Sequence, residues 1–132
     1  MSLTINVAIR PWRDGNQIAK LSLDGTLDTA TAPNLEKALD AAFEGPTQIL
    51  VFDLANLSFL SSGGVRVILA GRKRVLERNG GACMMLRVQP RIEKTFEIIK
   101  ALDGLQFLQD EAALDKYLSA LQHQTPDGIV VS

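Results

Sequence analysis

Two serines stand where a predicted strand meets a predicted helix, and their hydroxyls are the first candidates for chemistry in this chain. Ser61 and Ser62 follow the apolar run 49–54 and precede a helical pattern over residues 65–78. A helix N-terminus has free backbone N–H groups and a partial positive charge, so a phosphate on a serine there would be stabilised electrostatically. The simpler interpretation is a helix N-cap, which is what a serine before a helix usually provides. The local pattern leaves both roles open for either serine.

Enzymatic apparatus is hard to assemble from the remaining polar residues. The single histidine, His123, lies near the C-terminus, in an expected tail, so a Ser-His-Asp triad would depend on a mobile residue. Gly63-Gly64 lacks the spacing of a dinucleotide-binding fingerprint, and no glycine-rich phosphate loop with its lysine is present. Asp24, Asp28 and Asp53 lie near predicted strand ends, where capping or turn formation is their expected use. We therefore predict a protein that is not an enzyme and that has no cofactor or metal site.

Composition restricts the class of protein. The 132 residues are 46% hydrophobic, which suits one domain with a packed core. A net charge of −1, from 14 basic and 15 acidic residues, provides no overall attraction to nucleic acid or anionic membranes. The single cysteine, Cys83, excludes an internal disulfide, and its apolar neighbours predict a buried thiol.

No membrane or export signal is visible. Residues 1–7 lack both the basic start and the apolar block of a signal peptide. No apolar stretch reaches the ~18 residues that a spanning helix needs. We expect a soluble, cytoplasmic protein without direct membrane insertion.

Hydrophobic periodicity predicts the order of secondary structure. Alternation over 3–9 and 18–23 indicates a hairpin, followed by a loop over 24–28 and a helix with Pro33 in its first turn. The later elements are a strand over 49–54, the helix that follows Ser62, a strand over 82–88, a helix from Pro90, a short strand at 107–108 and a helix capped by Asp110. Strands that alternate with helices predict one α/β domain. Its mixed, mostly parallel sheet of four to five strands would have about four helices packed on it, over residues 1–121, with a flexible tail over 122–132.

The helix after Ser62 is predicted to bury one face and to present another. The apolar stripe expected to face inward is Val65, Ile68, Leu69, Val75 and Leu76. The residues that point away from this stripe, and so form a small, flat docking surface with an exposed valine, are Gly63, Arg66, Val67 and Ala70. The basic residues of this helix, expected to form a solvated face, are Arg66, Arg72, Lys73, Arg74 and Arg78.

The stretch 53–67, with Ser61-Ser62-Gly63-Gly64-Val65 at its centre, resembles the motif of STAS domains and specifically of bacterial anti-sigma factor antagonists. Gly25-Thr26-Leu27-Asp28 resembles the Gly-x-Leu-Asp loop of that family, and residues 31–35 resemble the helix start that follows the loop. The likeness covers about residues 3–120. Three positions differ: Ser61 stands where the family usually has aspartate, Gly63 replaces a second serine and Arg66 replaces a glycine.

This resemblance implies a switch. In the family, the serine at this helix start is phosphorylated by an anti-sigma factor that is also a serine kinase with a histidine-kinase-like ATPase fold. Phosphorylation releases the antagonist, and a metal-dependent serine phosphatase restores binding. The matching position here is Ser62, with Ser61 as the alternative acceptor. The implied partner surface comprises Gly25, Thr26, Leu27, Asp28, Ser61, Ser62, Gly63, Gly64, Arg66, Val67 and Ala70.

Two other functions remain open. STAS domains also occur without phosphorylation, as scaffolds or subunits of stressosome-like or lipid-transport assemblies, and the absence of the family's aspartate at Ser61 would suit that use. The carboxyl ends of parallel strands could instead bind a small ligand or a nucleotide.

Folding is predicted to need no metal or cofactor, because the apolar stripes suffice for a core and no ligand cluster is visible. A chelator should leave the thermal melting midpoint unchanged. A large drop in that midpoint would contradict the prediction.

Overall fold

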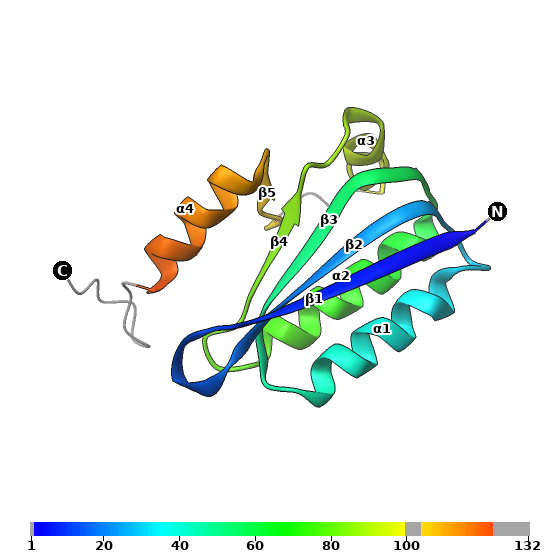
Figure 1. The fold of residues 1–132 in the computed structure, drawn as a ribbon. Coiled ribbons are helices and arrows are strands. Elements are labelled where there is room, and N and C mark those ends of the chain that lie inside the picture. Colours follow the sequence, from blue (N-terminus) through cyan, green and yellow to red (C-terminus); the bar gives the residue numbers. More distant parts are fainter. Residues whose placement is uncertain (1, 100–103, 123–132) are drawn as a thin grey trace.

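The computed structural model describes residues 2–99 and 104–122, which form one five-stranded sheet and four α-helices (Figure 1). The strands are β1 (Leu3–Pro11), β2 (Gln17–Leu27), β3 (Thr47–Leu60), β4 (Ala82–Leu86) and β5 (Phe107–Leu108). The helices are α1 (Ala32–Glu44), α2 (Ser62–Leu76), α3 (Pro90–Ile98) and α4 (Glu111–Gln122). The sheet order is β1-β2-β3-β4-β5, with β1 antiparallel to β2 and the other neighbours parallel. The predicted mixed, mostly parallel α/β fold is confirmed.

Strands β3 and β4, in the middle of the sheet, are buried on both faces, which explains their continuous apolar runs. Along β3, Leu50 and Phe52 join the core beneath α1, α2 and α3. Ile49 and Val51 point the other way, into a second cluster that includes Leu114 of α4. Figure 1 shows α1 and α2 side by side on one face, with α4 apart from them. A strand covered on both faces has no polar side to alternate with its apolar one.

The prediction of a loop over 24–28 is wrong for residues 24–27, because β2 continues through Leu27. Strand β3 is also longer than the predicted 49–54, since it continues to Leu60. The two strands stay paired to Leu27 and Leu60 through irregularities in their register. Gly25 lies at one of these register irregularities and has a φ of +112°, which glycine adopts readily. A Cβ at this position would also collide with the carbonyl oxygen of Ser2. A segment rich in polar residues and glycine therefore forms strand.

The inward face of α2 is rotated from the predicted stripe. Val67, expected on the surface, is only 9% exposed, whereas Leu76, expected inside, is 44% exposed. Both corrections have one cause. The buried side of α2 is centred on Gly64 and Gly71, and a Cβ at Gly71 would lie 3.0 Å from Leu39 of α1. The two glycines let α2 approach its neighbours closely, a packing preference that a count of apolar residues misses.

The prediction that the basic residues along α2 form a solvated face is wrong for some of them, because three bind other parts of the chain. Arg78, just beyond the helix, donates to the carbonyl oxygens of Phe43, Gly45 and Thr47 at 2.8–3.0 Å. Arg74 forms an ion pair with Asp40 at 2.7 Å. Arg72 donates to the carbonyl oxygen of Gly104 at 2.9 Å. Arg78 thereby caps the end of α1 and holds it against the end of α2.

The C-terminal boundary is refined by one residue. Asp110 caps α4 as predicted, since its carboxylate accepts from the backbone N–H of Ala113 at 2.8 Å. Gln122, placed in the predicted tail, is the last residue of α4, and residues 123–132 lie outside the described residues. None of the helices in the described part of the chain is long and apolar enough to cross a membrane.

Cys83 lies in the core between the sheet and its helices, and burial raises the pKa of its thiol to about 12. The thiol is therefore neutral and covered at neutral and mildly alkaline pH. In the native protein, Cys83 should react with a thiol reagent far more slowly than in the denatured protein at the same pH. Equal labelling rates would contradict this burial.

Candidate functional site at the start of helix α2

The first turn of α2 assigns different roles to the two serines. The Ser61 side chain accepts a hydrogen bond from the backbone N–H of Gly64 at 3.2 Å, and the Ser61 carbonyl oxygen accepts from Val65 at 3.0 Å. The extended backbone of Ser61, with a φ of −93° and a ψ of 168°, is that of an N-cap. The capping role that the sequence left open between the two serines therefore belongs to Ser61.

Ser62 is the first helical residue and is exposed, as predicted. Its side chain stands at the positive end of a helix of 15 residues. Arg66 lies one turn further along and is also exposed. Residues four apart on a helix are surface neighbours, so the Arg66 guanidinium can reach a negative charge placed on Ser62.

Close backbone packing joins this helix start to the connection between β2 and α1. The N–H of Ser61 donates to the Leu27 carbonyl oxygen at 3.0 Å. A Cβ at Gly64 would lie 2.7 Å from Leu27 Cγ and 2.8 Å from the Leu27 carbonyl oxygen. A Cβ at Gly63 would lie 2.8 Å from Thr29 Oγ1. The structure thus brings together the two segments that the sequence assigned to one site.

Asp28 shapes the connection through its own hydrogen bonds. Its carboxylate accepts from the backbone N–H groups of Ala30 and Thr31 at 2.9 and 3.0 Å. The Thr31 hydroxyl donates to the Thr26 carbonyl oxygen at 2.8 Å. Asp28 therefore caps the turn that leads into α1, through the Oδ1 atom of its carboxylate.

The predicted partner surface divides into exposed and covered residues. Thr26, Leu27, Gly64 and Val67 are buried, so their side chains or backbone support the surface from beneath. The residues with exposed or partly exposed surface are Gly25, Asp28, Ser61, Ser62, Gly63, Arg66 and Ala70.

Two groups of residues near the site were not predicted from the sequence. Thr29 and Ala30 are exposed in the connection, and Thr29 lies against Gly63. The feature of the sequence that could have identified them is their position directly after Asp28. Glu36 and Asp40 of α1 face α2 across a groove of about 360 Å³, whose other wall includes Arg66 and Val67. Their helical spacing gave no indication of which helix they would face.

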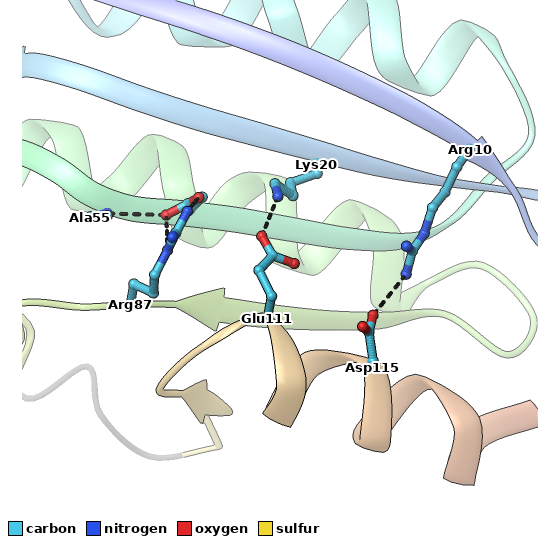
Figure 2. Close-up of polar contacts among 7 residues, drawn as sticks. Arg10, Lys20, Ala55, Arg87, Glu111 and Asp115 are labelled. Carbon is cyan, nitrogen blue, oxygen red and sulfur yellow. Dashed lines mark hydrogen bonds and ion pairs between the residues drawn. The ribbon is translucent and has the colours of Figure 1, made fainter.

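Asp53, a candidate for chemistry in the sequence, has a structural role on the face of the sheet opposite Phe52, beside Ala55 and Arg87, which Figure 2 labels. Its side chain is 5% exposed, accepts from the backbone N–H of Ala55 at 3.1 Å and pairs with Arg87. The hydrogen bond to Asp53 and its negative charge raise the pKa of Arg87. Within residues 2–99 and 104–122, no group of three His, Cys, Asp or Glu side chains could hold a metal ion.

The capping geometry predicts different effects for alanine at the two serines. Ser61→Ala should lower the free energy of unfolding by about 1 kcal/mol, because it removes the acceptor of the Gly64 N–H. Ser62→Ala should change it by less than about 0.5 kcal/mol, because Ser62 is exposed and does not cap. Denaturant unfolding of both variants measures the difference, and an equal loss would contradict the assignment.

Comparisons with known proteins agree with this geometry. The STAS domain family matches residues 13–113. An anti-sigma F factor antagonist of Lysinibacillus sphaericus is 30% identical over 97 residues, which cover 73% of this chain and 82% of that protein. The crystal structure of an anti-sigma factor antagonist from Mycobacterium paratuberculosis aligns with a TM-score of 0.69 and 25% identity, over 92% of this chain and 95% of that one.

The unphosphorylated form of the anti-sigma factor antagonist SpoIIAA has the same fold. It aligns with a TM-score of 0.61 at 24% identity, over 85% of this chain and 97% of that chain. The family match spans most of the sequence and includes β2, β3 and α2, the elements that build the candidate site. The chain therefore belongs to the STAS domain family, as the Ser61-Ser62-Gly63-Gly64 motif and its neighbours predicted.

Proposed function

We propose that this protein is an anti-sigma factor antagonist, a binding module that sequesters an anti-sigma factor and so releases a sigma factor for transcription. The observation that carries the proposal is the exposed Ser62 at the start of α2, in a composite surface with the connection between β2 and α1. The names of the relatives, anti-sigma F and anti-sigma B factor antagonists among them, support the same function.

The partner would contact a surface that is small and only weakly apolar. Ser62, Arg66 and Ala70 lie on successive turns of α2, and Thr29 lies against Gly63 at the helix start. Val67 enters this surface only as a wall of the groove between α1 and α2. With little apolar area to bury, binding would depend on shape and on hydrogen bonds, so a new charge would have a large effect.

The site has a serine hydroxyl without the partners of a nucleophile. One oxygen of the Asp28 carboxylate, Oδ1, accepts from the backbone of its own turn. The hydrogen bonds of the described side chains include none in which a base accepts from Ser62. An exposed hydroxyl without a base suits a substrate for a partner's kinase, and we propose a binding protein that is not an enzyme.

Ser62 is the proposed phosphoacceptor. Ser61 is less suited because its hydroxyl caps the helix and is partly buried. A phosphate on Ser62 would carry about 1.5 to 2 negative charges, and the helix end and Arg66 would stabilise it in the free protein. Docking would force the partner to desolvate this charge, which can cost several kcal/mol. Phosphorylation by an anti-sigma factor kinase would therefore release the protein, and a serine phosphatase would restore binding.

A constitutive scaffold is the second candidate, and one observation favours it. Ser61 stands where the STAS motif of anti-sigma factor antagonists usually has aspartate, and this change removes a charge next to the proposed acceptor. A scaffold would use the same surface without phosphate transfer to Ser62. The two functions differ in whether a charge at residue 62 controls binding.

Substitution at Ser62 separates these functions. Ser62→Asp should weaken binding to the cognate anti-sigma factor kinase by about tenfold or more, because the carboxylate adds a charge that the interface must desolvate. Ser62→Ala should bind within about twofold of wild type and should accept no phosphate. Both variants should unfold within about 1 kcal/mol of wild type. Calorimetric titration and radiolabelled phosphate transfer provide the measurements.

Ser61→Ala is the matched control, since it removes the neighbouring hydroxyl and should still accept phosphate at Ser62. Equal affinity for the wild type and the Ser62→Asp variant would reject the switch. If the Ser62→Ala variant still accepts radiolabelled phosphate and the Ser61→Ala variant does not, the phosphorylated residue is Ser61.

A further inference from the structure

Strand β1 is an edge strand whose outer backbone groups can be identified from its pairing with β2. Thr26 N–H donates to the Ser2 carbonyl oxygen, and Trp12 N–H donates to the Asn16 carbonyl oxygen. Both bonds join directly opposed residues, and in β1 such bonded pairs alternate with unbonded ones. The even-numbered residues therefore bond to β2. The odd-numbered residues, including Val7 and Ile9, direct their backbone N–H and C=O groups away from the sheet.

The side chains along this edge are also apolar and exposed. Val7 is 46% exposed and Ile9 is 49% exposed. They border a groove of about 470 Å³ between β1 and α1, where the exposed side of the helix carries the small residues Ala38 and Ala41. Natural edge strands are usually protected by lysine, by a bulge or by a covering element. Between Leu3 and Ile9, β1 contains no charged residue and no register shift.

The charges on α1 indicate what could cover this edge. Glu44 borders the same groove, and Lys37 precedes it by seven residues, two helical turns along the same side of α1. Both are exposed, and Ala41 lies between them. A two-fold axis near Ala41 would place Lys37 of one chain opposite Glu44 of the other. The pattern is therefore complementary to itself, which is the requirement of a symmetric dimer interface.

We propose that the occupant of this edge is a second copy of the chain. The two β1 strands would pair antiparallel about Val7 and join the two sheets into one. This register places Val7 opposite Val7 and Ile9 opposite Ile5, and it pairs the outward backbone groups of these three residues, whereas Pro11, opposite Leu3, has no N–H to donate. On the other face of the sheet, Arg10 lies opposite Thr4, so no like charges meet. The alanines allow the two α1 helices to pack closely, with Lys37 and Glu44 paired at both ends.

This dimer is independent of the proposed function, because it uses β1 and the outer side of α1 and not the Ser62 surface. Sedimentation of the full chain over a wide concentration range tests it. The wild type should form a dimer. Val7→Lys should weaken the dimer by about tenfold or more, because it places a charge on the edge strand. Leu76→Lys is the matched control, since Leu76 is 44% exposed on α2 and its variant should dimerise normally.

A charge swap tests the register. Lys37→Glu and Glu44→Lys should each weaken the dimer several-fold, because each places like charges together twice, and the double variant should recover most of the affinity. Amide exchange at Val7 and Ile9 should slow as concentration rises. A wild type that remains monomeric throughout, or a dimer that Val7→Lys leaves intact, would overturn the proposal. If the double variant does not recover dimer affinity, the proposed pairing of Lys37 with Glu44 between the two α1 helices is wrong.

Discussion

The candidate site depends on the close contact between Gly64 of α2 and Leu27 at the end of β2. The space normally taken by a Cβ at residue 64 is filled by Leu27 Cγ and by the Leu27 carbonyl oxygen. That carbonyl oxygen also accepts from the Ser61 N–H at 3.0 Å. Because the helix start is fixed against the strand end, the connection from Asp28 to Thr31 lies beside the first turn of α2, with Thr29 against Gly63, and two distant segments form one surface.

The same contact separates the tasks of the two serines. With its backbone extended and held at Leu27, Ser61 turns its hydroxyl toward the Gly64 N–H and caps the helix. Ser62 then begins the helix with its side chain in solvent. A cap can thus stabilise the fold permanently while the neighbouring hydroxyl stays available for modification. Since the helix end favours negative charge, a phosphate there need not disturb the fold.

Both faces of the sheet combine apolar packing with polar contacts, which on the face of α1 and α2 include the Arg74–Asp40 ion pair. Helices α1 and α2 pack through aliphatic side chains and glycines, and Arg78 fixes their ends by bonding three carbonyl oxygens. On the other face, ion pairs accompany the apolar contacts of α4: Lys20 pairs with Glu111 at 2.5 Å, and Arg10 pairs with Asp115 at 3.9 Å (Figure 2). These pairs are at least partly exposed and contribute little individually, so the apolar cluster around Leu114 provides most of the attachment.

Periodicity and turn residues in the sequence by themselves determined the element order, the mixed sheet, the buried Cys83 and the family motif around Ser62, because these follow from local patterns of apolar and capping residues. Tertiary structure alone decided the extent of β2 and β3, the capping role of Ser61 and the exposure of Val67 and Leu76. The orientation of α2 depends on how closely Gly64 and Gly71 approach Leu27 and Leu39, which are distant in sequence. Contacts of this kind leave no local pattern, because the sequence around a glycine does not show which distant atom packs into the space where a side chain would be.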